Sequence, residues 1–230
     1  AMTSTIPPSQ SQADDGFAVT VKTRSPGRPK DFALGMKRRE DILEAATRLF
    51  AHRGFRNTDL KMVADELGVA KGTIYNYFES KNDLFVACVT FGMARLRLFV
   101  RARTRDISEP LEVISCAVES YFHFFDEHPE VVELLVQERA EFKDRETSTY
   151  FLGWDEHKLP WLELFEKLKA DGIFRDMSSE AVYEFMSNQV YGTLFANYFS
   201  GKKKPLASQT GVTLDILYRG ILQGGQRSEY

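Results

Sequence analysis

A short polar segment directly after a glycine turn carries the clearest chemistry in this chain. Lys71, Thr73 and Asn76 follow the turn at Gly68, and we expect their side chains to point outward from a short helix. Ammonium, hydroxyl and amide groups presented in this way can form hydrogen bonds with base edges or phosphates. Gly72 has no side chain, so it would let the helix N-terminus approach a phosphate closely. The segment therefore predicts contact with duplex DNA.

Neighbouring residues extend this candidate surface. Tyr75 and Tyr77 can donate hydroxyl hydrogen bonds to phosphates. Lys81, at the start of a predicted fourth helix, is placed for a phosphate contact. Thr58 is expected first to cap a helix and only second to contact the DNA backbone. Alternatives remain open, since Tyr77 could pack against the first helix and Asn76 could be solvated surface. Ile74 and Phe78 are expected in the core.

Helical elements are predicted to hold this surface in place. Apolar residues recur at helical spacing in a first helix that starts near residue 37 and in a second helix that ends at Leu67. Gly54 should end the first helix, and Thr58 should cap the second. Gly68 can adopt the left-handed conformation of a sharp turn into a third helix over residues 70–78. Ser80 and Asp83 resemble a capping box that opens a fourth helix, which runs to about Arg105.

Residues 1–36 are rich in Ser, Pro, Gly, Thr and Gln and predict a flexible arm. Arg28 and Lys30 lie among prolines, which would keep this basic segment extended and able to enter a minor groove. A solvated basic linker is the alternative, and the sequence does not decide whether the arm reaches the groove.

The net charge of −3 hides an asymmetry along the chain. Residues 22–81 contain 13 Lys and Arg against 8 Asp and Glu, whereas residues 82–230 contain 17 against 23. A basic N-terminal module on an acidic body is the distribution expected when one end meets phosphates.

The segment from Gly68 to Phe78, followed by Lys81 and Leu84, resembles the DNA-binding signature of the tetracycline-repressor (TetR) family. The resemblance covers about residues 37–90. Ala70 departs from the family pattern, which more often has Ser or Thr there, and forfeits a cap contribution of about 1 kcal/mol. The resemblance implies a cytoplasmic, homodimeric regulator, most simply a repressor that binds a palindromic operator as double-stranded DNA and is released by a hydrophobic small-molecule inducer.

The predicted fold is all-α with about nine helices and no alternating strand pattern. A flexible arm over residues 1–36 precedes a three-helix helix-turn-helix domain over 37–83 and a helical regulatory and dimerisation domain over 84–230. In the family the last domain encloses the inducer pocket and forms the dimer interface. Aromatic residues of this half are candidate pocket residues: Phe122, Phe125, Trp154, Trp161, Tyr191 and Phe195. Apolar faces of the last two long helices are candidate interface positions: Phe185, Gln189, Gly192, Leu217 and Ile221. Core packing is the competing interpretation of both sets.

Other classes of function are disfavoured. The four histidines form no zinc-binding spacing, and no catalytic motif is present, so we expect neither an enzyme nor a cofactor. Cys88 and Cys116 are expected to be buried thiols, and no apolar run approaches the roughly 18 residues of a membrane span. A metal-responsive regulator of the same fold and a helix-turn-helix interaction module without DNA remain as alternatives. The operator sequence, the inducer, the target genes and the choice between repression and activation are not written in the chain.

Overall fold

The computed structural model describes residues 29–152, 154–201 and 204–223. The chain divides into two compact units, residues 1–37 and 38–230. In the first unit, the described residues form the beginning of helix α1 (Pro29–Arg53). Proline is favoured at the first position of a helix, because its φ is already helical and its missing N–H would be unpaired there. The helix therefore starts at Pro29, earlier than the predicted start near residue 37.

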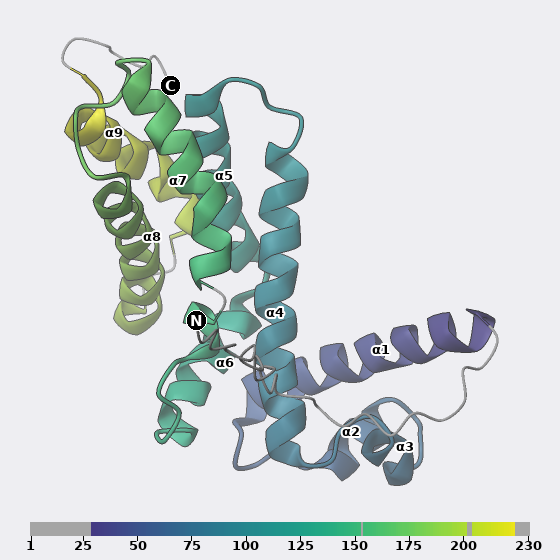
Figure 1. Cartoon of the computed structure of the whole chain (residues 1–230). Coiled ribbons are helices and arrows are strands. Elements are labelled where there is room, and N and C mark those ends of the chain that lie inside the picture. The colour runs from purple at the N-terminus through teal and green to yellow at the C-terminus, as the bar shows by residue number, and fades with distance from the viewer. Residues whose placement is uncertain (1–28, 153, 202–203, 224–230) are drawn as a thin grey trace, which may run out of the picture. The chain divides into compact units, whose positions relative to one another are not determined.

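The second unit contains the rest of α1 and all the other helices. Two short helices follow α1, α2 (Leu60–Glu66) and α3 (Lys71–Tyr75), and then the long α4 (Lys81–Thr104), all visible in Figure 1. The remaining elements are α5 (Pro110–Glu127), α6 (Pro129–Glu141), the 3-10 turn η1 (Thr149–Phe151), α7 (Trp154–Ala170), α8 (Ser179–Ser200), the 3-10 turn η2 (Leu206–Gln209) and α9 (Thr210–Ile221). The regular elements of the described residues are helical apart from one isolated bridge, between Phe174 and Leu222. The prediction of an all-α fold is confirmed.

The first core layer of this unit joins α1, α2 and α3 to the start of α4. Ile42, Phe50, Val63 and Ile74 are fully buried, and Phe85 of α4 packs edge-on against Phe50 with ring centroids 5.0 Å apart. Burial of an apolar side chain of this size contributes about 1.5–3 kcal/mol. The short helices α2 and α3 therefore depend on this shared core, because isolated helices of this length are not stable in water.

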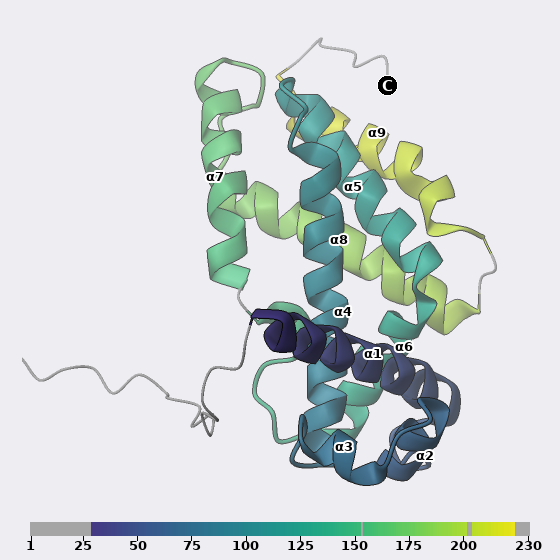
Figure 2. The same ribbon diagram turned by 90° about the vertical axis from the view of Figure 1, so that its right-hand side faces the viewer.

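The helices that follow α3 pack together, with α5 among them in the largest number of pairings. Helix α4 contacts α5 and α6, α7 contacts α8, and α5 also contacts α8 and α9 (Figures 1 and 2). At the α4–α6 crossing, a Cβ added to Gly92 would lie 2.9 Å from a methyl carbon of Val131. Only glycine permits this close approach, so Gly92 sets the spacing between α4 and α6.

Candidate nucleic-acid interface

The turn between α2 and α3 sets the direction of α3. Gly68 has a φ of +64°, and its N–H donates to the carbonyl of Asp65 at 3.1 Å. Val69 follows with an N–H that donates to Ala64 at 2.9 Å. These two bonds close the C-terminus of α2 and reverse the chain over a few residues, as in other helix C-caps with a left-handed glycine. The left-handed conformation predicted for Gly68 is confirmed.

Asp59, not Thr58, caps α2. The Asp59 carboxylate accepts the N–H of Met62 at 2.9 Å, and this hydrogen bond holds the pKa of Asp59 below its usual value. Thr58 is fully buried, and its hydroxyl donates to the carbonyls of Gly54 at 2.9 Å and Leu49 at 3.3 Å. The predictions of Thr58 as a cap and as a DNA contact are therefore wrong, because its buried side chain forms hydrogen bonds inside the corner between α1 and α2.

Helix α3 presents most of its side chains to solvent. Ile74 is its one fully buried residue, while Lys71, Gly72, Tyr75 and Asn76 are exposed. Thr73 is half-buried. Ala70 precedes the helix without a side-chain cap, as expected from its methyl group. The predicted outward placement of the polar residues is confirmed in this short helix, which ends at Tyr75 rather than at residue 78.

The exposed groups of α3 form a cationic, hydrogen-bonding surface. The Lys71 ammonium lies 5.6 Å from the centre of the Tyr75 ring, a distance compatible with a cation–π contact. The side chains of Lys71, Thr73 and Asn76 have no hydrogen-bond partner among the described residues. Phe78 is buried behind this surface under the guanidinium of Arg39, 5.2 Å from its ring centre.

Tyr77 and Lys81 both have structural contacts within the protein. Tyr77 is half-buried and packs against the core, which favours the alternative stated for it. The Lys81 ammonium donates to the carbonyls of Phe55 at 2.9 Å and Arg56 at 3.4 Å and lies 4.4 Å from the centre of the Phe55 ring. Lys81 therefore ties the start of α4 to the α1–α2 corner, and any phosphate contact would have to use its remaining N–H.

The arm residues fall at or beyond the limit of the described chain. Arg28 lies outside the described residues. Lys30 lies in the first turn of α1, and the structure describes its backbone only.

Three contacts join the helix-turn-helix to α6. The Gln137 side-chain amide donates to the carbonyl of Phe50 at 3.0 Å. Arg56 pairs with Glu141 at 3.0 Å, and Phe142 packs edge-on against Phe55 with ring centroids 5.3 Å apart. These contacts connect the end of α1 and the following corner to the end of α6. A shift of α6 would therefore also displace the segment that supports α3.

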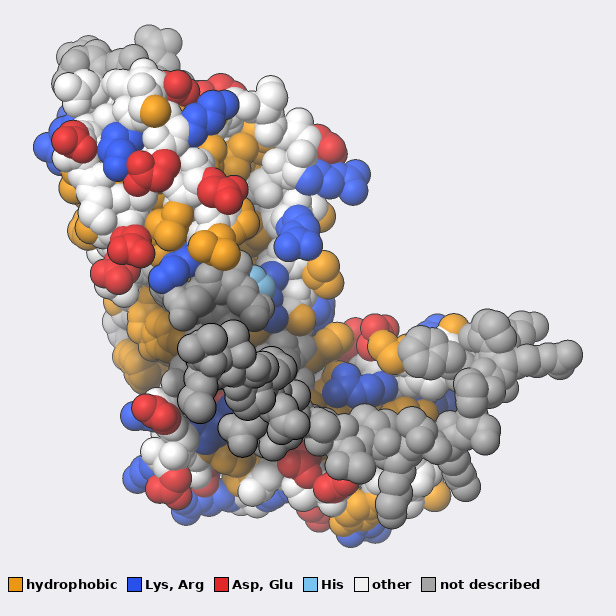
Figure 3. Space-filling model, viewed as in Figure 1, with side chains coloured by type: hydrophobic (Ala, Val, Ile, Leu, Met, Phe, Trp, Pro, Cys, Tyr) orange, Lys and Arg blue, Asp and Glu red, His pale blue; other side chains and the backbone are white. Residues whose placement is uncertain are grey.

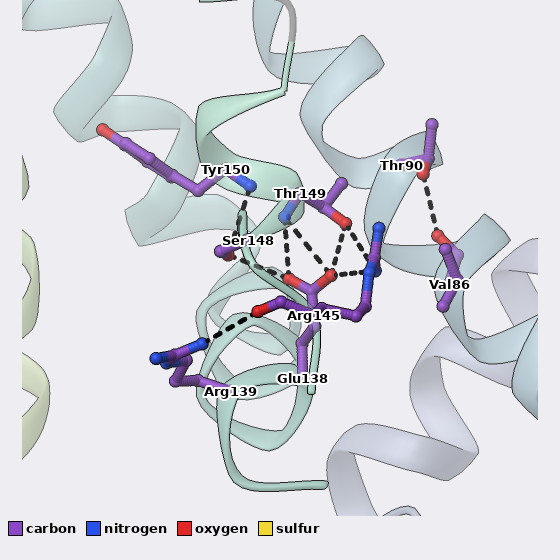
Figure 4. A network of polar contacts seen from close by, with 8 residues as sticks. All are labelled: Val86, Thr90, Glu138, Arg139, Arg145, Ser148, Thr149 and Tyr150. Atoms are coloured by element: carbon purple, nitrogen blue, oxygen red, sulfur yellow. Dashed lines mark hydrogen bonds and ion pairs between the residues drawn. The ribbon is translucent and has the colours of Figure 1, made fainter. Parts of the chain in front are cut away.

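The loop after α6 is organised by a buried carboxylate (Figure 4). Glu138 is 2% exposed and accepts from Arg145 at 2.5 Å, Ser148 at 3.0 Å and the backbone N–H of Thr149 at 3.1 Å. The Thr149 hydroxyl also donates to it. A buried carboxylate is tolerated when it is paired and hydrogen-bonded in this way. The network positions η1 and, with it, Tyr150.

Tyr150 joins the predicted pocket residues into an aromatic cluster. Its hydroxyl lies 2.5 Å from that of Tyr121, and burial raises the pKa of both phenols. Its ring packs against Tyr191, whose ring centroid lies 4.5 Å from that of Phe195. Tyr121 in turn contacts Phe125 at 5.0 Å. Phe122 is fully buried and packs edge-on against Tyr121, with ring centroids 6.0 Å apart. Four of the six predicted residues, Phe122, Phe125, Tyr191 and Phe195, thus belong to one cluster.

The remaining two predicted pocket residues are tryptophans. Trp161 packs against Phe165 with ring centroids 6.4 Å apart. The side chain of Trp154 lies outside the described residues. Phe125 also lines a groove in the described part of the chain.

The predicted interface residues separate into two groups. Phe185, Gln189 and Gly192 are exposed on α8, at a spacing that places them on one face. Leu217 and Ile221 are 2% and 4% exposed and pack inside the same protomer, so their prediction as interface residues is wrong. The exposed apolar residues of α9 are instead Val212 and Ile216. Figure 3 shows hydrophobic side chains at the surface over the C-terminal end of α8, where Phe199 is 69% exposed.

Two other kinds of site were sought in the described residues. Within them, no group of three or more His, Cys, Asp or Glu side chains could hold a metal ion. None of the described helices combines the length and apolar character needed to cross a bilayer.

Comparison with known sequences agrees with this geometry. Residues 42–88 match the family described as bacterial regulatory proteins, tetR family. The HTH-type transcriptional repressor KstR2 of Mycobacterium tuberculosis (strain ATCC 25618 / H37Rv) is 26% identical over 160 residues, which make up 67% of this chain and 78% of that protein. The uncharacterized HTH-type transcriptional regulator YerO of Bacillus subtilis (strain 168) is 27% identical over 117 residues, 50% of this chain and 40% of that protein.

Solved structures share the fold. The regulator FadR from Bacillus subtilis, in complex with stearoyl-CoA, aligns with a TM-score of 0.62 and 18% identity over 79% of this chain and 98% of its own. A transcriptional regulator from Saccharomonospora viridis, in complex with choline, aligns with a TM-score of 0.67 and 21% identity over 84% of this chain and 100% of its own. At these identities the likeness concerns the fold.

Proposed function

We propose, because the chain belongs to the tetR family of bacterial regulatory proteins, that two copies of it bind a palindromic operator and release it when a small hydrophobic molecule binds. The exposed surface of α3 carries the proposal. Lys71, Thr73 and Asn76 project unpaired donors and acceptors from a helix that Ile74 anchors, next to a turn set by Gly68. A short helix presented in this way fits a major groove, where side chains read base edges while cations contact phosphates.

Operator binding can be tested with DNA fragments from upstream of the chain's own gene. Fluorescence anisotropy at increasing salt should show affinity falling, with a slope of about −0.9 for each phosphate contact in log–log form. Lys71→Ala should weaken binding, whereas Lys167→Ala should not, because Lys167 is an exposed lysine near the end of α7. Binding that does not respond to salt, or equal effects of both variants, would contradict the proposal.

The dimer is proposed to form through the exposed faces of α8 and α9. Phe185, Val212 and Ile216 are 49%, 66% and 57% exposed, and Gly192 would allow a second helix to approach closely. Apolar faces at the end of a helical domain suit a four-helix contact between two subunits. Light scattering should find a dimer that Phe185→Arg dissociates. Leu98→Arg is the matched control, because Leu98 is 64% exposed on α4, and it should leave the dimer intact.

The inducer is proposed to be a small hydrophobic molecule. Support comes from the aromatic cluster around Tyr150 and Tyr191, and from related folds solved with stearoyl-CoA and with choline. A ligand shifts operator affinity only if it binds one conformation better than the other. Titration of hydrophobic ligands into the protein–operator complex should therefore lower operator affinity. Ligands that bind the protein but leave operator affinity unchanged would contradict induction.

A further inference from the structure

A groove of about 720 Å³ lies where α1 ends and shares Phe125 with the aromatic cluster around Tyr150. It is lined by the C-terminal end of α1, by α5 and α6, and by the C-terminal end of α8 with the segment that follows. Figure 2 shows the ends of α1 and α8 on either side of α6. Its buried floor is apolar: Phe125, Val132, Leu194 and Leu206. The volume is in the range of small-molecule sites, about 300–1,000 Å³.

The carboxylates that line this groove are already engaged. Asp126 accepts the backbone N–H groups of Leu206 at 2.8 Å and Ala207 at 2.9 Å. Glu133 accepts from the Gln137 amide at 2.9 Å and from the Tyr198 hydroxyl. The third, Glu130, lies 3.2 Å from the His128 ring. These hydrogen bonds use part of the acceptor capacity of the three carboxylates and hold the walls of the groove.

The basic side chains that line the groove are less engaged. His52 and Lys204 are exposed, and their side chains have no hydrogen-bond or ion-pair partner within the described part of the chain. Arg48 lies 3.8 Å from Glu66, with 60% of its side chain exposed, so its guanidinium forms only a loose ion pair. The available charged donors at the rim are therefore cationic, whereas the floor is apolar.

We infer that this groove binds a small amphipathic anion, with its hydrocarbon body on the floor and its anionic group near Arg48, His52 and Lys204. A carboxylate placed there forms charge-assisted hydrogen bonds, which are stronger than neutral ones. The inference rests on the proposed function and gives the inducer a chemical class and a site that adjoins the aromatic cluster at Phe125.

The position of the groove suggests how its occupant acts on DNA binding. Ala51 and His52 line it, and they directly follow Phe50, whose carbonyl accepts the amide of Gln137 on α6. On the opposite wall, the Tyr198 hydroxyl of α8 donates to Glu133 of α6. An anion in the groove would thus contact α1 and α8 at once and change how α6 holds the helix-turn-helix, provided that it favours one spacing over the other.

Decanoate, used below the concentration at which it forms micelles, is the probe. Calorimetry on the full chain should find one site per chain, with decanol and decylammonium binding at least tenfold more weakly. Lys204→Glu should weaken decanoate at least tenfold, since it replaces an attraction by a repulsion. Lys167→Glu carries the same charge change on α7 and should leave decanoate affinity within about twofold. Decanoate should also lower operator affinity in the wild type and do so less in Lys204→Glu.

Absent decanoate binding, equal effects of the two lysine variants, or preferred binding of decylammonium would overturn the inference. Decanoate binding without a change in operator affinity would overturn its regulatory role. Operator affinity is measured first without any ligand, so the two proposals fail separately. Intact operator binding with no decanoate site removes only this inference, whereas absent operator binding removes the proposed function and leaves calorimetry to judge the groove.

Discussion

Polar side chains are exposed and free of hydrogen bonds to the described protein on the surface of α3, whereas those in the loop around Glu138 are buried or hydrogen-bonded to one another. On α3, Lys71 and Asn76 are exposed and have no hydrogen bond to the described protein. Around Glu138, a buried carboxylate accepts from Arg145, from Ser148 and from the backbone of the next residue. Buried polar groups need hydrogen-bond partners within the protein, whereas exposed ones are solvated and remain available to another molecule. The loop is therefore built for a fixed structure, and α3 for contact with another molecule.

The largest expected effect is on the structural side of this comparison. Glu138→Ala should lower the free energy of unfolding by about 3 kcal/mol, because it leaves the buried Thr149 N–H and the Arg145 guanidinium without their acceptor. Urea unfolding at neutral pH measures this loss. Glu146→Ala removes an exposed carboxylate of the same loop and should change stability by less than about 0.5 kcal/mol. Equal losses of unfolding free energy in the two variants would show that the Glu138 network does not stabilise the fold more than an exposed carboxylate does.

The next effect is on the binding side. Lys71→Ala and Asn76→Ala should each weaken operator binding by about 1–3 kcal/mol. Both should leave the urea midpoint nearly unchanged, because both side chains are exposed and the Lys71 ammonium lies over a Tyr75 ring that is itself exposed. The two should differ in kind. Lys71→Ala should weaken all sequences alike and reduce the salt slope by about 1, whereas Asn76→Ala should relax specificity at one position. A loss of stability in either variant would break the contrast with Glu138.

A pair of glycines sharpens the same contrast within one turn. Gly68→Ala should cost about 1 kcal/mol of stability, because Gly68 has a φ of +64°. Gly72 lies in α3 with open space around it, so Gly72→Ala should raise stability by up to about 1 kcal/mol. Yet it should weaken operator binding, since the added methyl group separates the helix from the DNA backbone. Thermal unfolding and anisotropy on the same samples test the opposite signs; a Gly72→Ala variant that binds as well as the wild type would place the DNA elsewhere.

The smallest effect concerns pH. The hydrogen bond from Met62 holds the pKa of Asp59 below its usual value of about 3.9. The ionised cap therefore stabilises α2 above that pH, and the contribution is lost as pH falls through the lowered pKa. Asp59→Asn cannot titrate, so the difference in melting temperature between wild type and variant should shrink below about pH 4. A difference that stays constant down to pH 2.5 would show that this cap does not depend on charge.

Local features were predictable from the sequence. The turn at Gly68, the missing cap at Ala70, the end of α1 before Gly54 and the Ser80 cap of α4 all agree with the structure. Each depends on residues within about four positions along the chain. The Thr58 cap failed although it is also local, because Thr58 and Asp59 are both good caps and only burial shows which one faces inward.

Contacts between distant segments were not predictable. Lys81 was expected to face phosphate, but its ammonium binds a carbonyl 26 residues away. Leu217 and Ile221 lie on an apolar face of α9, as predicted. An apolar face does not indicate which surface covers it, and here residues of the same protomer bury both side chains. Glu138 gave no signal, because its partners lie in an irregular loop.

The sequence by itself determined the helices, the glycine turn and the polar face of α3, because these depend on backbone preference and on a period of 3.6 residues. Tertiary structure alone decided which polar groups remain available to a partner, which apolar face stays uncovered, and where α1, α6 and α8 leave a groove. Those properties depend on burial and on pairing across the chain, and a linear pattern contains neither.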